Sequence, residues 1–294
     1  MPARSAISHA RALLRAAERV AVLTGAGISA ESGIPTFRDA MSAAGPPQGA
    51  RPPGGERRVA TIGGDHTAVG PPQGARPPGG ERRVATIGGD HTAGLWSQFR
   101  PEDLATPEAF AANPKTVWEW YAGRRERVAK VAPNAGHTAL VALEKRTPHF
   151  TLITQNVDGL HARAGSRNVI ELHGNIMVDR CFAEGCVLTP AEEIPGAPPR
   201  CARCGAPVRP GVVWFGEALP PQALDDALAA TKRCDVFLSI GTSNVVEPAA
   251  SLPFAALDAG AAVIEVNPER TPLSARATIV LPGAAGEVLP RLVG

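Results

Sequence analysis

The length, composition and charge of this chain indicate a globular protein and exclude several classes. Its 294 residues are 44% hydrophobic and 20% charged, enough to build a core for one large or two modest domains. A formal net charge of +2 gives no electrostatic attraction to nucleic acid or anionic lipid, and no apolar run reaches membrane-spanning length. We expect a cytoplasmic monomer with neither nucleic-acid nor membrane partners.

Residues 1–20 are rich in arginine and poor in acids, so both a transit peptide and a structural helix are considered. Their apolar residues recur at helical spacing, at Ile7, Ala10, Leu13, Leu14 and Ala17. The segment also runs directly into a predicted strand, so that its removal would shorten the fold. We therefore expect a helix.

The first apolar run is followed by a glycine turn. Val20–Thr24 is continuous and apolar, which predicts a buried strand of a parallel sheet. Gly25 and Gly27 let the backbone turn tightly, so that amide groups can approach a pyrophosphate, and Ser29 adds a hydroxyl. A helix that begins here would direct its free N–H groups at the same anion. Because Ala30 holds the third small position of G-x-G-x-x-G, a turn without a ligand stays open.

A perfect tandem repeat follows. Gly45–Ala68 recurs unchanged as Gly70–Ala93, and ten of its 24 residues are Gly or Pro. Such a segment buries too little apolar surface to offset the entropy of ordering, which predicts a tolerated surface insertion over residues 43–93. The alternative is an anion-binding lid built from its arginines, at 51, 57, 58, 76, 82 and 83.

Further strand-like runs alternate with helical segments. They are Phe150–Thr154, Val169–Leu172, Asp235–Ile240, Ala262–Val266 and Thr278–Leu281. The first four end at polar or glycine-bearing turns, which are Q-N-V-D-G at 155–159, H-G-N at 173–175, G-T-S at 241–243 and N-P-E at 267–269. In a doubly wound sheet, ligands bind outside the carboxyl ends of the strands. The pattern predicts an α/β protein with a Rossmann-like parallel sheet that binds a nucleotide.

Four cysteines form two pairs. Cys181 and Cys186 are separated by four residues, and Cys201 and Cys204 by two. Paired thiolates of this kind fold around tetrahedral zinc, and four of them leave no open position, so we expect a structural zinc. Four free thiols are the alternative, and Cys234 fits a small buried hydrophobe.

One histidine stands out as a candidate base. His173 follows an apolar strand and precedes a glycine, which predicts an imidazole exposed at a sheet edge. His137 and His161 lie at predicted helix starts, where a capping or core role is the simpler interpretation.

Several motifs occur in the order in which one family carries them: G-A-G-I-S-A-E-S-G-I-P-T-F-R-D from residue 25, T-Q-N-V-D-G-L-H from 154, E-L-H-G-N from 171, V-V-W-F-G-E from 212 and G-T-S from 241. The chain therefore resembles the sirtuin family of NAD-dependent protein deacylases over nearly its whole length, apart from residues 43–93. The resemblance implies a Rossmann-like NAD-binding domain (1–40, 133–176 and 211–294), a helical module of a smaller domain (41–132, interrupted by 43–93) and a zinc module (177–210).

The resemblance also implies residue roles. The NAD-binding residues would be Gly25, Ala26, Ser29, Phe37, Arg38, Gln155, Asn156, Asp158, Gly241, Thr242, Ser243, Asn267 and Ala285. The catalytic residues would be His173, as general base, and Asn156, while Val213 and Phe215 would grip the backbone of an acyl-lysine substrate. The acyl-lysine oxygen would attack the ribose carbon that bears nicotinamide, and the products would be nicotinamide, lysine and O-acyl-ADP-ribose.

The acyl preference rests on one helical pair. Tyr121, the only tyrosine, precedes Arg124 by three residues and shares its helix face. The pair resembles the Tyr-x-x-Arg of sirtuins that remove succinyl and malonyl groups, where both side chains bind a carboxylate. A solvated helix face is the alternative. For the chain as a whole, a mono-ADP-ribosyltransferase and a non-catalytic NAD-sensing scaffold are the alternative functions.

Overall fold

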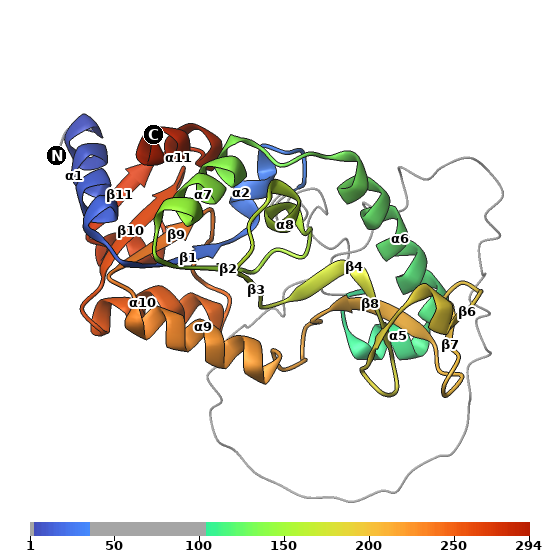
Figure 1. The fold of residues 1–294 in the computed structure, drawn as a ribbon. Coiled ribbons are helices and arrows are strands. Elements are labelled where there is room, and N and C mark those ends of the chain that lie inside the picture. Colours follow the sequence, from blue (N-terminus) through green and yellow to red (C-terminus); the bar gives the residue numbers. More distant parts are fainter. Residues whose placement is uncertain (1–2, 36–103) are drawn as a thin grey trace, which may run out of the picture.

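A computed structural model describes residues 3–35 and 104–294 as two lobes (Figure 1). The larger lobe is a six-stranded sheet in the order β3-β2-β1-β9-β10-β11, with all neighbours parallel. Its strands are β1 (Arg19–Thr24), β2 (His149–Thr154), β3 (Val169–Glu171), β9 (Val236–Ile240), β10 (Ala262–Asn267) and β11 (Ile279–Pro282). The predicted α/β, Rossmann-like fold is confirmed. The predictions for Phe37, Arg38 and residues 43–93 lie outside the described residues.

Helices cover both faces of this sheet (Figure 1). One face carries α1 (Ala3–Ala16), α7 (Ala135–Arg146) and α11 (Ala285–Val293), and the other carries α9 (Pro221–Arg233) and α10 (Leu252–Asp258). Alternate residues of β1 point to opposite faces, so Val22 joins one core and Leu23 the other. The predicted N-terminal helix is confirmed, because Ala10 and Leu14 of α1 are buried in the first core.

The strand order creates a switch point between β1 and β9. The strand that follows β1 in the sheet, β2, lies on one side of this central pair, and the strand that follows β9, β10, lies on the other side. In open α/β sheets the ligand crevice lies outside the carboxyl ends of such a pair. Short helices follow two of the strands, α2 (Ala26–Ala30) after β1 and α8 (Leu160–Ala164) after β2, and the 3₁₀ turns η2 (Ala249–Ser251) and η3 (Pro272–Ala275) follow β9 and β10.

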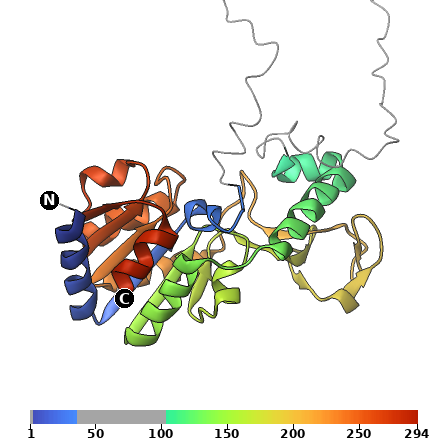
Figure 2. The same cartoon turned by 90° about the horizontal axis from the view of Figure 1, so that it is seen from above.

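The smaller lobe combines two helices with two small antiparallel sheets, β5-β4-β8 and β6-β7, and lies to one side of the parallel sheet (Figure 2). Its elements are α5 (Pro107–Ala112), α6 (Pro114–Lys130), β4 (Gly174–Cys181), β5 (Val187–Leu188), η1 (Pro190–Glu192), β6 (Glu193–Ile194), β7 (Arg200–Cys201) and β8 (Val208–Val212). Sequence analysis missed β4 and β8. An aromatic core holds the lobe together, and Arg125 ties α6 to β4 through Asp179 at 2.5 Å. Among the described helices, none has the length and apolar character needed to cross a bilayer.

Candidate active site

Three glycines bring the loops after β1 and β9 into contact at the switch point. The Gly25 amide donates to the Ile240 carbonyl at 3.0 Å, and the Gly27 amide donates to the Gly241 carbonyl at 2.8 Å. A Cβ atom on Gly25 or Gly27 would approach Gly241 atoms to 2.8 or 2.7 Å, and Gly241 has a φ of +59°. The glycines are therefore required for loop packing itself, a role that sequence analysis did not assign to them.

Three predicted cofactor residues form one buried polar cluster. Ser29 donates from Oγ to Asp158 Oδ2 at 2.8 Å, and Asn156 donates from Nδ2 to Ser29 Oγ and to the Gly25 carbonyl, both at 3.1 Å. The amide of Leu160 donates to Asp158 Oδ1 at 2.9 Å. All three cluster residues are at most 9% exposed. Their side chains are therefore fixed before any ligand arrives.

A second group lies on the loops after β2 and β9 and at the last residue of β10. Gln155 donates from Nε2 to Thr242 Oγ1 at 2.9 Å, and Asn267 donates from Nδ2 to the Thr242 carbonyl at 2.8 Å. Ser243 is exposed beside them. Ala285, at the start of α11, is buried in the core, so the structure places its side chain in the packing of α11.

His173 lies at the junction of the two lobes, between β3 and β4. Its Nδ1 donates to the Gln155 carbonyl at 2.9 Å, which leaves the lone pair of the neutral ring on Nε2. Burial lowers the pKa of His173, and the bond to Gln155 offsets only part of this effect. The ring is half-buried rather than exposed as predicted. At neutral pH it is therefore an oriented, uncharged base.

The segment after β8 borders this histidine. The Val213 amide donates to the His173 carbonyl at 2.8 Å, and the Phe215 amide donates to the carbonyl of Ala105 at 2.9 Å. The Phe215 side chain is 44% exposed. The two predicted substrate residues thus follow directly after β8 and lie next to His173, and their role in binding a peptide stays a prediction.

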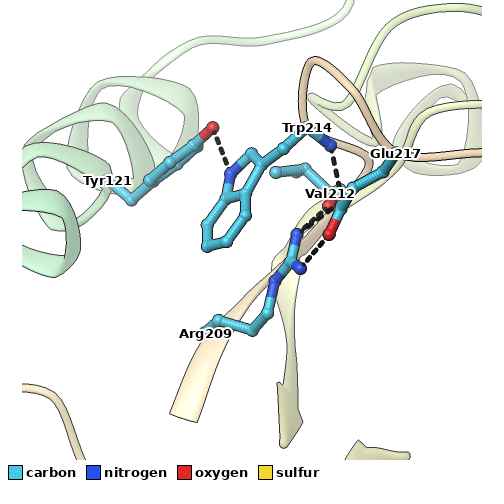
Figure 3. Close-up of polar contacts among 5 residues, drawn as sticks. All are labelled: Tyr121, Arg209, Val212, Trp214 and Glu217. Carbon is cyan, nitrogen blue, oxygen red and sulfur yellow. Dashed lines mark hydrogen bonds and ion pairs between the residues drawn. The ribbon is translucent and has the colours of Figure 1, made fainter. Parts of the chain in front are cut away.

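The predicted acyl pair lies on α6. Tyr121 is buried, and its Oη accepts a hydrogen bond from Trp214 Nε1 at 2.9 Å (Figure 3). The Cζ atom of Arg124 is 4.7 Å from the centroid of the Trp120 ring and 6.0 Å from that of Tyr121. Within residues 3–35 and 104–294, no carboxylate pairs with Arg124. Burial of Tyr121 excludes a fully solvated helix face, and it raises the pKa of that phenol to about 12.

The cysteines form two similar turns at the far end of the small lobe. The amide of Cys181 donates to the Cys186 carbonyl at 3.0 Å, and that of Cys201 donates to the Ala206 carbonyl at 2.9 Å. The Sγ atoms of Cys181, Cys201 and Cys204 lie within 4.8 Å of one another. Tetrahedral zinc with Zn–S bonds of about 2.3 Å separates its sulfurs by about 3.8 Å, so the three thiols fit zinc. Cys186 is outside that group, and its role as fourth ligand stays a prediction.

A buried polar network at the ends of β1 and β2 was not predicted from the sequence. Thr24 Oγ1 lies 2.9 Å from both Thr154 Oγ1 and His161 Nε2, at the ends of β1 and β2. The rings of His161 and His137 are 4.8 Å apart, and His137 also closes the capping box of α7 with Asn134. The expected capping or core role of both histidines is confirmed. The signal for His137 was present in the sequence, because Asn134 precedes it by three residues.

Comparison with known proteins gives a consistent result. A sequence profile of the Sir2 family matches residues 89–248. An NAD-dependent protein deacylase of Ralstonia nicotianae is 45% identical over 290 residues, covering 98% of this chain and 96% of the relative. An NAD-dependent protein deacylase of Aquifex aeolicus is 48% identical over 259 residues, which cover 87% of this chain and 85% of the relative.

Solved structures agree with these relatives. A Sir2 homologue in complex with NAD matches with a TM-score of 0.73 at 41% identity, covering 97% of this chain and 92% of that one. A Sir2 protein bound to a myristoylated histone peptide matches with a TM-score of 0.66 at 31% identity, covering 99% and 95%.

Proposed function

This chain belongs to the Sir2 family, and from that premise we propose that it is an NAD-dependent protein-lysine deacylase. The observation that carries the proposal is His173, whose Nδ1 donates to the Gln155 carbonyl and whose Nε2 has no hydrogen-bond partner among the described residues. This oriented base lies beside a buried polar cluster at the carboxyl ends of β1 and β2.

The donor set at the switch point fits NAD. The side chains of Ser29, Asn156 and Asp158 offer a hydroxyl, an amide and a carboxylate, which suit ribose hydroxyls and the nicotinamide amide. The backbone amide of Ala26, the first residue of α2, suits the pyrophosphate, whereas the Gly25 amide is already bonded to the Ile240 carbonyl. Gln155 would join Asn156 and Asp158 at the ribose and nicotinamide, and the adenosine half would be held by Gly241, Thr242, Ser243 and Asn267. When bound, NAD would supply the ADP-ribosyl group that accepts the acyl group, with neutral nicotinamide as the leaving group.

His173 would act as general base at a ribose hydroxyl. Burial keeps its ring neutral, and the bond from Nδ1 to the Gln155 carbonyl fixes the tautomer that accepts a proton at Nε2. Asn156, held by Ser29 and by the Gly25 carbonyl, orients the reacting end of the cofactor. Val213 and Phe215 would align the substrate backbone, because their segment is fixed to the His173 carbonyl.

The preferred acyl groups carry a terminal carboxylate. Arg124 has no acidic partner among the described residues, and its Cζ atom lies 4.7 Å from the Trp120 ring centroid and 6.0 Å from that of Tyr121. A half-buried guanidinium beside a phenol binds a carboxylate through charge-assisted hydrogen bonds, as in a succinyl or malonyl group. An acetyl group makes no use of the pair, so deacetylation would be a second activity.

We further propose that the thiol turns hold one structural zinc, with Cys186 as the fourth ligand beside Cys181, Cys201 and Cys204. Metal analysis of the purified protein tests this. One zinc per chain is expected, and a Cys186→Ala variant should bind it more weakly.

The acyl preference is tested by a matched substrate panel. The protein is incubated with NAD and one peptide that carries acetyl-, malonyl- or succinyl-lysine. Hydrogen bonds to charged groups contribute about 1.5–3 kcal/mol, so Arg124→Met should lose about 13- to 160-fold in kcat/KM on the two acidic substrates and little on the acetyl peptide. Arg127→Met is the control, because Arg127 is exposed on the same helix. Equal losses on all three peptides would contradict the carboxylate assignment.

A further inference from the structure

Trp214 contacts Tyr121 and Arg209 with two different parts of its ring (Figure 3). Its indole Nε1 donates to Tyr121 Oη at 2.9 Å, and the Cζ atom of Arg209 lies 3.4 Å from the ring centroid. Trp214 is only 2% exposed, and its ring also packs against Phe110, with centroids 5.3 Å apart. The indole therefore has one fixed orientation.

An ion pair between Arg209 of β8 and Glu217, which follows β8, fixes this orientation of Trp214. Arg209 pairs with Glu217 through both of its terminal nitrogens, and one of these also donates to the Val212 carbonyl at 2.8 Å. Glu217 Oε2 accepts in addition from the Trp214 amide at 2.8 Å. The pair thus fixes the backbone of Trp214 through Glu217 and its ring through Arg209.

The pair is charged at neutral pH. Burial raises the pKa of Glu217, but the hydrogen bonds from Arg209 and from the Trp214 amide outweigh this effect, and the pKa lies below its ordinary value. The side chains of Arg209 and Glu217 are 11% and 26% exposed, so water screens them only partly. Arg209 and Glu217 therefore stay paired at neutral pH and keep Trp214 in this orientation.

The contact with Trp214 fixes how the phenol of Tyr121 can bind a ligand. An indole N–H is a donor only, so the phenol oxygen must accept from it, and the phenol's own proton must point elsewhere. Among the described residues, Tyr121 Oη makes no other hydrogen bond. The adjacent Arg124 is also a donor without an acceptor. Two donors that lack an acceptor lie side by side in the proposed acyl site.

We propose that Trp214 is a positioning residue for acyl specificity, which occupies the acceptor side of the Tyr121 phenol so that its proton points at the acyl group. The favoured ligand is an acyl chain that ends in a carboxylate, since a carboxylate accepts from both Tyr121 and Arg124. The inference rests on the proposed deacylase function. It goes beyond the Tyr-x-x-Arg pair because it assigns the orientation of that pair to a residue in the segment after β8.

The kinetic test compares Trp214→Phe with wild type on succinyl- and acetyl-lysine peptides. Phenylalanine keeps an aromatic ring over Arg209 and removes the N–H. One hydrogen bond contributes about 0.5–1.5 kcal/mol, so kcat/KM for the succinyl peptide should fall about 2- to 13-fold, chiefly through KM, with the acetyl peptide within about twofold. Trp118→Phe is the control, because Trp118 stacks on Arg125 in the same lobe.

A double variant separates positioning from general damage. In a Tyr121→Phe background there is no hydroxyl to orient, so Trp214→Phe should leave the succinyl-to-acetyl ratio unchanged. The inference would be overturned by equal losses on both peptides, by an unchanged ratio in the single variant, or by additive changes in the double variant.

A spectroscopic test needs no turnover. Because Tyr121 is the only tyrosine, the tyrosine Fermi doublet in the Raman spectrum reports on this one phenol. Wild type and Trp118→Phe should show a phenol oxygen that accepts a hydrogen bond, and Trp214→Phe should lose that signature. If wild type removed no acyl group, the proposed function would fail, and the doublet would still decide about Trp214: an unchanged doublet in Trp214→Phe overturns the inference.

Discussion

The proposed cofactor end and the proposed acyl end of the candidate site are held together by different kinds of contact. At the cofactor end, Ser29, Asn156 and Asp158 lie just after strands of one sheet and bond through short side chains. At the acyl end, Tyr121 and Trp214 meet across 93 residues of sequence, on a helix and on a segment beyond a small sheet. The first end is fixed by strand pairing and the second by side-chain packing. Substitutions at the first should affect every substrate, and those at the second should affect the choice among substrates.

The largest expected effect comes from removing the base. His173→Ala should lower kcat about 10²- to 10⁴-fold with acetyl, malonyl and succinyl peptides alike, because it removes general-base catalysis. Affinity for NAD, measured by calorimetry, should change little. His149→Ala, at an exposed position at the start of β2, is the control. A loss confined to acidic acyl groups would contradict the division of labour between the two ends.

The pH profile of wild type checks the same residue. Burial lowers the pKa of His173 below 6.5, so the neutral, active form prevails at neutral pH. Activity should therefore be level near pH 7 and fall with acid only below about pH 6.5. An acid limb centred above pH 7 would mean that a different group is the base.

A smaller effect is expected from Asp158→Ala at the cofactor end. The change leaves the Ser29 hydroxyl and the Leu160 amide without their acceptor, and an unsatisfied buried polar group costs about 1–3 kcal/mol. We expect a loss of that size in the free energy of unfolding, together with weaker NAD binding and an unchanged acyl preference. Denaturant unfolding and calorimetry measure the first two. A changed succinyl-to-acetyl ratio would show that the two ends are not independent.

The smallest effect on activity is expected from Glu217→Gln at the acyl end. It removes the negative partner of a largely buried Arg209 and weakens the support of Trp214. Stability should fall by about 1.5–3 kcal/mol, the contribution of hydrogen bonds to charged groups. The succinyl-to-acetyl ratio should fall several-fold, while the dissociation constant of NAD stays the same. Weaker NAD binding with an unchanged succinyl-to-acetyl ratio would contradict this prediction, because it would show that Glu217 acts on the cofactor and not on the choice of acyl group.

The difference between the two ends also explains what the sequence could predict. Strands buried on both faces of a parallel sheet are continuous apolar runs, and for that reason the bounds of β1, β2 and β10 were predicted within one residue. The candidate site residues that come after these strands could also be predicted, because ligands bind at the carboxyl ends of such strands.

Other features left no such signal. The strand β8 has the sequence V-R-P-G-V, whose proline and glycine argue against a strand. The bond from Trp214 to Tyr121 joins distant segments through a single contact, which no local pattern encodes. The role of Gly25 against Gly241 likewise depends on which strands are neighbours, and spacing along the chain does not specify that.

The most direct test of the deacylase assignment is a balance of products. Wild-type protein is incubated with NAD and a succinyl-lysine peptide, and all products are identified by mass spectrometry. The account predicts equal amounts of nicotinamide, free-lysine peptide and O-succinyl-ADP-ribose. Nicotinamide released together with ADP-ribose attached to protein, while the peptide stays acylated, would contradict it.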